Sequence, residues 1–299
     1  IEASSAATAD EIAWAMTFNI LATAIVTPMS GWLAGRFGTR RVMVWSLAGF
    51  TFATFMCGAA ESLEGLVFWR IMQGGFGAPS TPLTQSILLT VFPRDQQTRV
   101  MGIFGFGVVL GPIFGPALGG IMPESYNWRW AFYALVPVGI AATVGLRAVL
   151  PEDENMTDRP LDWIGFIALS IALGATQLVL ARGQRLDWFD SYEIIIAAIV
   201  AVICFWIFAA HCLTSPRPFL DPRLLLDRNY ALGLILVTIY GMLNFTPMVL
   251  LPPLLTGPAG YTDSLVGLVV GARGAGGCIG FLIAGFAGRL DARVSMIIG

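Results

Sequence analysis

Two arginines, Arg70 and Arg273, lie inside long apolar stretches of the sequence. A charge within a membrane is costly unless it faces a cavity or a partner, so each arginine marks a candidate functional site. Arg70 is only a few residues into its stretch, and its side chain could instead reach the membrane surface. Arg273 lies nearer the middle of its stretch, and for it a functional role is the stronger interpretation.

A second candidate is the sequence GWLAGRFGTRR, residues 31–41, which joins two apolar stretches. Its glycines predict a tight turn, and its cations suit helix C-termini and carboxylates, where they can hold one conformation. The alternative is ordinary positive charge on the cytoplasmic side. The candidate conformational residues are Gly31, Gly35, Arg36, Gly38, Arg40 and Arg41.

A third candidate is the glycine-rich and proline-containing stretch at residues 107–120. Glycines at every fourth position allow a second helix to approach closely, and prolines remove backbone donors and bend a helix. Such a helix suits a gate hinge or a seal, although ordinary helix packing through small residues is the alternative. The candidate residues are Gly107, Gly111, Pro112, Gly115, Pro116, Gly119 and Gly120.

Polar and adaptable side chains within the apolar stretches are weaker candidates for lining a substrate cavity. Methionine and aromatic residues suit promiscuous sites, and amides can orient a ligand. Hydrogen bonding between helices and ordinary core packing are the competing interpretations. The candidates are Asn19, Met72, Phe76, Tyr240 and Asn244.

The remaining reactive residues do not predict an enzyme. The carboxylates lie at the ends of apolar stretches or in loops, and the single histidine, His211, is interpreted as a membrane-interface residue. The four cysteines lie in apolar runs without metal-type spacing and are expected to be buried free thiols. We therefore expect no catalytic residues, metal site or cofactor.

Composition indicates that these residues are positioned by membrane-spanning helices. Of the 299 residues, 56% are hydrophobic and 12% are charged, with a mean hydropathy of +0.75. Soluble domains carry roughly 25% charged residues. Backbone groups in lipid must pair within each segment, which favours helices. The nine predicted spans are 11–33, 42–60, 66–92, 97–121, 130–149, 163–181, 193–213, 230–255 and 264–287.

Arginine placement predicts the orientation of these spans. Of the 17 cations, all arginine, 12 lie in one set of alternate loops and three in the other. The positive-inside rule makes the first set cytoplasmic. The net charge of −2 gives no indication of nucleic-acid binding.

Several of these motifs, in order, resemble the major facilitator superfamily. Residues 31–41 resemble its loop between helices two and three, except that Gly35 stands where the family usually has Asp. Residues 66–79 are similar to its helix-four motif, and residues 107–120 to the antiporter motif of its exporters. The stretches WRWAF at 128–132 and VPVG at 136–139, with the loop at 182–189, resemble the fourteen-helix drug:proton antiporter branch (EmrB/QacA-like).

The resemblance implies a proton-coupling role for Arg70, Gln73 and Gly74. We group Arg273 with them and expect both arginines to neighbour a coupling acid outside this sequence. The implied fold is all-α and polytopic, a major facilitator fold of two helical bundles, incomplete at both ends. Its predicted parts are an N-terminal bundle lacking its first helix (1–149), two extra linker helices (150–215) and the start of a C-terminal bundle (216–299).

The resemblance also implies a function. We expect proton-coupled efflux of lipophilic drugs or toxic compounds by a multi-pass protein of the cell inner membrane. Protons, a small lipophilic substrate and membrane lipid are the implied partners, together with a periplasmic adaptor and an outer-membrane channel. Export of a specific metabolite or siderophore and a non-transporting membrane fragment are the alternatives.

Overall fold

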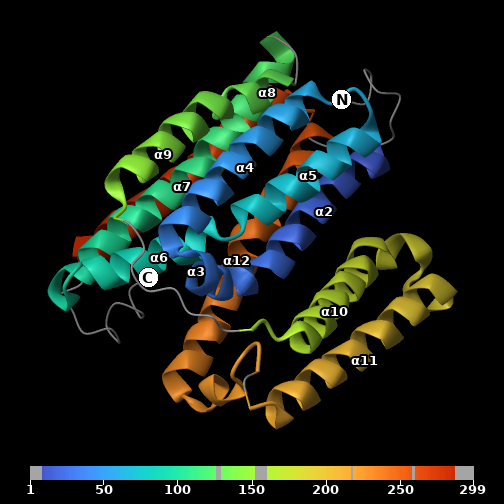
Figure 1. Ribbon diagram of the computed structural model, residues 1–299. Coiled ribbons are helices and arrows are strands. Elements are labelled where there is room, and N and C mark those ends of the chain that lie inside the picture. The colour runs from blue at the N-terminus through green and yellow to red at the C-terminus, as the bar shows by residue number, and fades with distance from the viewer. Residues whose placement is uncertain (1–8, 126–128, 152–159, 217, 258–259, 287–299) are drawn as a thin grey trace. The chain divides into compact units, whose positions relative to one another are not determined.

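A computed structural model describes residues 9–125, 129–151, 160–216, 218–257 and 260–286. Every regular element in these ranges is a helix (Figure 1). The helices fall into two compact units. One comprises Ile1–Leu83 and Leu135–Leu234, and the other comprises Thr84–Ala134 and Ile235–Gly299. The chain therefore enters each unit twice, and the predicted division near residues 149 and 215 stays a prediction.

The first unit is a row of packed helices with a helical hairpin. Within the row, α5 packs against both α2 and α4, and α4 packs against α9 (Figure 1). The hairpin consists of α10 and α11, and α10 contacts α2. The helices are α2 (Ala9–Val26), α3 (Ser30–Phe37), α4 (Thr39–Ala59), α5 (Leu63–Gly77), α9 (Leu135–Val149), α10 (Trp163–Arg182) and α11 (Tyr192–Thr214), with short 3-10 turns at Thr27–Met29, Gly183–Leu186, Trp188–Asp190 and Pro222–Leu226.

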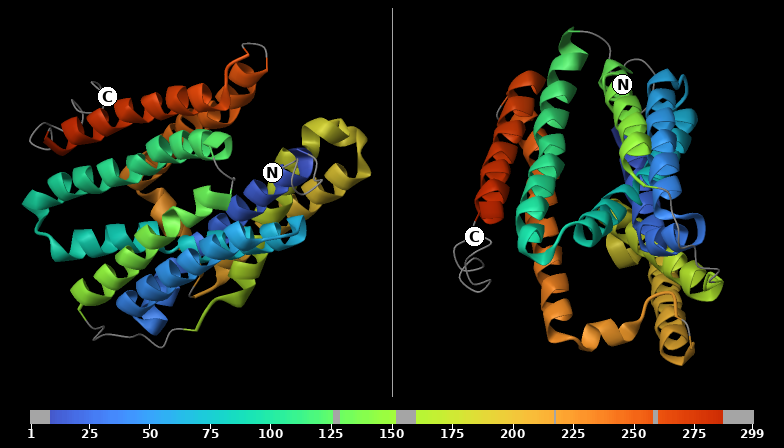
Figure 2. Two further views of the ribbon diagram at one scale, coloured as in Figure 1. Left: turned by 90° about the horizontal axis from the view of Figure 1, so that it is seen from above. Right: turned by 60° about the vertical axis from the view of Figure 1, so that its left-hand side comes forward.

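The second unit is built around α7 and α13, which pack side by side (Figure 2). Glycines permit this approach, since a Cβ on Gly105 would collide with the Phe281 ring and one on Gly277 would lie 3.2 Å from Val109. The unit's helices are α7 (Arg94–Ser125), α8 (Arg129–Tyr133) and α13 (Asp263–Phe286), with most of α6 (Ser80–Val91) and of α12 (Arg228–Thr256).

Six helical segments of the described chain are long and apolar enough to cross a membrane, and each matches a predicted span. Two further predicted spans also have helices: α7 covers the span at 97–121, and α13 contains a shorter apolar stretch, Leu265–Phe281. The six segments are Trp14–Phe37, Thr39–Ala59, Arg129–Val149, Trp163–Leu186, Tyr192–Thr214 and Arg228–Thr256.

Two details of the prediction were wrong. The predicted span 66–92 is not one helix, because a turn at Ala78 and Pro79 separates α5 from α6. Proline cannot donate its backbone nitrogen to the preceding turn, which explains a break here. The break expected between the predicted spans 11–33 and 42–60 is also mostly helical, since α3 ends at Phe37 and α4 begins at Thr39.

Candidate functional site

The side chain of Arg70 belongs to a polar cluster formed by α2, α4 and α5. Arg70 Nη1 donates to Gln73 Oε1 at 3.0 Å, and Gln73 Nε2 donates to Thr54 Oγ1 at 2.8 Å. Asn19 Nδ2 donates to the Arg70 carbonyl at 2.8 Å and lies 3.5 Å from Gln73 Oε1. Gln73 and Thr54 are only 5% and 1% exposed. Three helices are thus joined through one buried amide.

The crossing of α2 and α5 brings these groups within reach of one another. A Cβ on Gly74 would collide with the Asn19 carbonyl oxygen, so only glycine permits this backbone approach. Thr23 Oγ1 contacts the Asn19 and Gly74 carbonyls at 2.9 and 3.2 Å. Gln73 and Arg70 are three residues apart on α5 and therefore share a helix face.

The arginine-rich stretch, residues 31–41, contains a one-residue turn between α3 and α4. Gly38 has φ 91° and ψ 142°, a conformation that favours glycine. The turn starts α4, and Arg40 Nη2 donates to the Arg147 carbonyl at 2.7 Å. Arg147 is in the last turn of α9, where carbonyls lack helical donors and cations are favoured. Arg40 therefore caps the C-terminus of α9 from the N-terminus of α4.

Arg273 belongs to a separate cluster in the second unit. Arg273 Nη2 donates to the Leu243 carbonyl at 3.0 Å and lies 3.4 Å from Asn244 Oδ1. Asn244 Nδ2 donates to the Tyr240 hydroxyl at 3.0 Å. The three side chains line a cavity of about 270 Å³. Arg273, Tyr240 and Asn244 were predicted for two different roles, and the structure brings them together.

A third cluster joins the two ends of the α10–α11 hairpin. Asp162 caps α10 by accepting from Gly165 N at 3.0 Å, and it accepts from Phe219 N at 2.9 Å. His211 Nε2, near the end of α11, lies 2.8 Å from Asp162 Oδ1. Partial burial acts to raise the pKa of Asp162, but the hydrogen bonds from Gly165, Phe219 and His211 outweigh it and lower that pKa.

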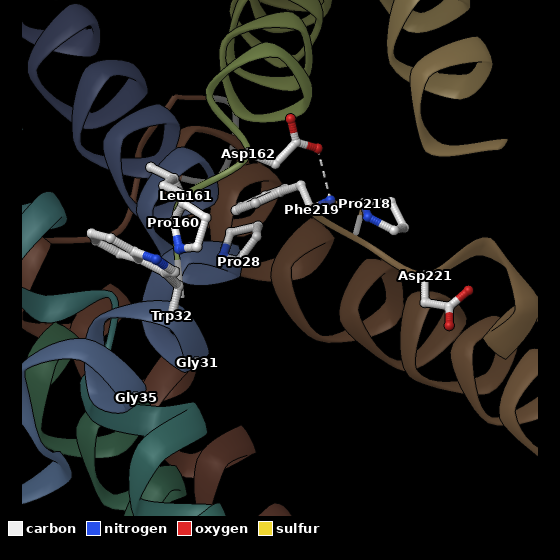
Figure 3. Close-up of a pocket in the computed structure, with 10 residues that line it drawn as sticks. All are labelled: Pro28, Gly31, Trp32, Gly35, Pro160, Leu161, Asp162, Pro218, Phe219 and Asp221. Carbon is white, nitrogen blue, oxygen red and sulfur yellow. Dashed lines mark hydrogen bonds between the residues drawn. The ribbon is translucent and has the colours of Figure 1, made fainter. Parts of the chain in front are cut away.

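Asp162 also lines a cavity of about 660 Å³ beside the arginine-rich stretch. Figure 3 shows the Trp32 ring, Pro28 and Phe219 along this cavity, with the Asp162 carboxylate turned toward the Phe219 nitrogen and the Asp221 carboxylate further away. Gly31 and Gly35 of α3 complete the same wall. The hairpin and the arginine-rich stretch therefore share one cavity.

The apolar helices, the one-residue turn at Gly38 and the pairing of Arg70 with the buried Gln73 agree with a comparison of sequences. A family model described as Major Facilitator Superfamily matches residues 2–299. The chain belongs to this superfamily. With six apolar segments long enough to span a membrane, this facilitator is a multi-pass integral membrane protein.

Curated relatives of this facilitator include named resistance proteins. It is 36% identical over 284 residues to "Multidrug export protein EmrB" of Escherichia coli (strain K12), covering 95% of this chain and 55% of the relative. It is 34% identical over 262 residues to "Fatty acid resistance protein FarB" of Neisseria gonorrhoeae, covering 87% and 52%. The chain spans about half the length of these relatives.

The other predicted site residues of this facilitator are dispersed. Met72 and Phe76 line an apolar groove of about 370 Å³ in the first unit, together with Trp45 of α4. In α7, a Cβ added to Gly107, Gly111 or Gly115 would meet no atom within 4 Å. The predicted close packing through these glycines therefore has no partner in the described part of the chain, and the gating role stays a prediction.

The prolines of this motif lie within α7, which continues through Pro112 and Pro116 to Ser125. The side-chain surroundings of Pro112, Pro116, Gly119 and Gly120 lie outside what the structure describes. Of the cysteines, Cys57, Cys212 and Cys278 are buried free thiols, and Cys204 is half-buried.

Sequence reasoning missed Thr54, Thr23 and the Asp162–His211 pair. His211 was interpreted as an interface residue, and Asp162 as a solvated helix cap. Asp162 does cap α10, but its side chain is 11% exposed and the pair closes the hairpin. The sequence did contain a signal for this pair. His211 is the only histidine and lies near the end of the predicted span 193–213, and Asp162 directly precedes the span 163–181 on the same predicted side of the membrane.

Proposed function

We propose that the full-length protein is a secondary active transporter of the cell inner membrane that exports lipophilic compounds in exchange for protons. The observation that carries the proposal is the Arg70–Gln73–Thr54 cluster, a fixed cation bound to a buried amide within apolar helices. An intramembrane cation of this kind is expected to serve transport or proton movement. Relatives named for multidrug export support this choice.

In this proposal, Arg70 favours the ionised form of a nearby carboxylic acid, and so helps that acid to release its proton. Gln73 fixes the guanidinium, because its Oε1 accepts from Arg70 while its Nε2 is held by Thr54. The described carboxylates lie at helix ends and in turns, so we place the coupling acid outside the described residues.

The turn at Gly38 is proposed to act as a conformational latch. Arg40 links the start of α4 to the end of α9 through a hydrogen bond to the Arg147 carbonyl. A contact of this kind can hold one state of an alternating-access cycle and be released in the other. The glycines and prolines of α7 are proposed to form the hinge or seal predicted from the sequence.

The substrate class follows from the apolar cavity walls and from the names of the relatives. Met72, Phe76 and Trp45 offer an adaptable apolar surface for a lipophilic molecule. Two relatives are named for multidrug export and for fatty acid resistance, and these names support the choice of a lipophilic substrate. A periplasmic adaptor and an outer-membrane channel are proposed partners, by family resemblance.

The test measures drug accumulation in efflux-deficient cells that carry the full-length gene. Wild type is expected to lower accumulation, and a protonophore or Arg70→Gln is expected to abolish the effect. The control is Arg223→Gln, which changes an exposed arginine of the turn Pro222–Leu226. If Arg70→Gln exports at the wild-type rate, the coupling role of Arg70 is wrong. If wild type at normal expression exports no lipophilic drug, a narrow metabolite exporter is the better interpretation.

A further inference from the structure

Arg273 lies well inside the apolar part of its helix. It is the middle residue of the apolar stretch Leu265–Phe281 of α13. Either end of that stretch is about 12 Å away along the helix axis. Its side chain is exposed, and it forms no ion pair with any residue that the structure describes. A guanidinium at this depth therefore has its charge uncompensated within the described chain.

One nitrogen of Arg273 forms a hydrogen bond to α12, and a proline in that helix explains why the acceptor is free. Pro247 lies inside α12 and has no amide proton to donate to the Leu243 carbonyl one turn earlier. Arg273 Nη2 donates to that carbonyl at 3.0 Å. Pro247 thus leaves the Leu243 carbonyl without a helical donor, and one guanidinium nitrogen of Arg273 supplies the missing hydrogen bond.

The position of the Arg273 guanidinium determines how the other polar groups of this cluster are oriented. A guanidinium only donates, so Asn244 must turn Oδ1 toward Arg273 and Nδ2 toward Tyr240. The Tyr240 oxygen then accepts from Asn244, and its O–H is left to donate. Arg273 has donors on Nε and Nη1 in addition to Nη2. The polar groups offered by this cluster are therefore donors.

The cavity beside these donors has apolar walls. Leu243 and Met248 of α12, Val270 of α13 and Val109 of α7 all line it. Its volume of about 270 Å³ is slightly below the roughly 300–1,000 Å³ of ligand pockets, which suits a head group with part of a chain. An anion is attracted far more strongly in such surroundings than in water.

We propose that Arg273, oriented by Asn244 and Tyr240, binds the carboxylate of an amphipathic substrate whose apolar chain lies along Met248 and Val270. This inference rests on the proposed function and names one substrate class for it. Arg273 is then a specificity-determining residue, in place of the proton-coupling role predicted from the sequence. Asn244 and Tyr240 act as positioning residues.

The test uses full-length protein in lipid nanodiscs and two matched fluorescent probes. The probes are 11-(dansylamino)undecanoic acid and its methyl ester, which differ in the negative charge and in one methyl group, and empty nanodiscs give the background. Wild type is expected to bind the acid at least about tenfold more tightly than the ester, as suits a charge-assisted pair. Arg273→Gln is expected to reduce this ratio to near one, and Arg273→Lys to give an intermediate ratio.

Asn244→Asp gives a second, independent variant, because it places a carboxylate beside the guanidinium at nearly unchanged volume. It is expected to lower acid binding by about tenfold or more, since the new carboxylate competes for Arg273. Arg223→Gln, in an exposed turn, is the control and is expected to keep the wild-type ratio.

Two results would overturn the inference. One is an acid-to-ester ratio that stays at the wild-type value in both Arg273→Gln and Asn244→Asp. The other is an equal loss of acid and ester binding in both variants, which would make the cluster structural. A protein that exports nothing in cells but keeps the predicted binding pattern contradicts the proposed export and leaves this site standing.

Discussion

At the residue scale, two neighbouring glycines of α5 differ in whether an added methyl group would fit against α2. A Cβ on Gly74 would collide with the backbone oxygen of Asn19, whereas one on Gly75 would lie 3.9 Å from its nearest neighbour, Val26. Asn19 is also the residue that donates to the Arg70 carbonyl. The helix crossing and the polar cluster therefore depend on the same position.

We predict that Gly74→Ala destabilises the protein, because the α2 backbone must move away and weaken the Asn19 contacts. Overpacking of this kind costs about 1–3 kcal/mol. Gly75→Ala is the matched control and is expected to change stability by less than about 1 kcal/mol. Thermal unfolding in detergent compares the two, and equal melting temperatures would contradict the proposed crossing.

A second residue-scale prediction concerns the turn before α4. Gly38 has φ 91°, and a side chain there is strained, at a cost of about 1–3 kcal/mol. Gly38→Ala is therefore expected to lower the unfolding free energy by that amount and to shift Arg40 away from the Arg147 carbonyl. Gly31→Ala in the same motif is the control, because a Cβ on Gly31 meets no atom within 4 Å. If the two variants unfold alike, the strain argument fails.

At the scale of elements, prolines and caps decide where backbone groups find partners. In α12, Pro247 leaves the Leu243 carbonyl for Arg273, and in α9 the helix end leaves the Arg147 carbonyl for Arg40. In both cases an arginine of another helix supplies the donor. Arginines thus join helices through carbonyls in each unit.

We predict that Pro247→Ala restores the helical donor to the Leu243 carbonyl and frees Arg273 Nη2. Replacing an interior proline stabilises an isolated helix by up to about 3 kcal/mol. The unfolding free energy is therefore expected to rise or stay level, while the acid-to-ester binding ratio changes because Arg273 loses its fixed position. Pro252→Ala, in the same helix, is the comparison, and identical binding in both variants would show that the Arg273 contact does not position it.

The α10–α11 hairpin supports a prediction about pH. The pKa of Asp162 is lowered, so its stabilisation is present above its ordinary value near 3.8 and is lost as the pH falls through the lower folded value. His211 and, nearby, Cys212 are the titratable groups that face this carboxylate. Asn keeps a helix cap but removes the negative charge. The stability difference between wild type and Asp162→Asn is therefore expected to be about 0.3–1 kcal/mol near pH 6 and to shrink below about pH 4.

This prediction is tested by measuring the unfolding free energy of wild type and of Asp162→Asn as a function of pH, with Asp227→Asn as the control. Asp227 caps α12 by accepting from Asn229 N and Tyr230 N, but it is exposed and has no histidine partner among its described contacts. A wild-type-minus-variant difference that grows below pH 4 for Asp162 would reverse the sign of the argument.

At the scale of the whole molecule, composition and the lengths of the apolar stretches were enough to predict the helices. The family resemblance placed Arg70 and Gln73 in one motif, where their side chains form a hydrogen bond. Thr54 could not be predicted, because its contact with Gln73 depends on how α4 and α5 cross. Asp162 and His211, 49 residues apart, meet only because the hairpin closes. Pro247 leaves the Leu243 carbonyl without a helical donor, but no sequence rule names Arg273 as the residue that supplies one.

The orientation of the whole chain remains a prediction from its arginines, and cysteine labelling tests it. Arg223 lies in the turn Pro222–Leu226 on the predicted cytoplasmic side, and Asp190 lies in the turn Trp188–Asp190 on the predicted outer side. Both positions are exposed. A membrane-impermeant thiol reagent is expected to label Asp190→Cys in intact cells and Arg223→Cys only after permeabilisation, with the unsubstituted protein as background. The reverse pattern would contradict the positive-inside assignment and would move the Arg40–Arg147 contact and the Asp162 cavity to the outer face.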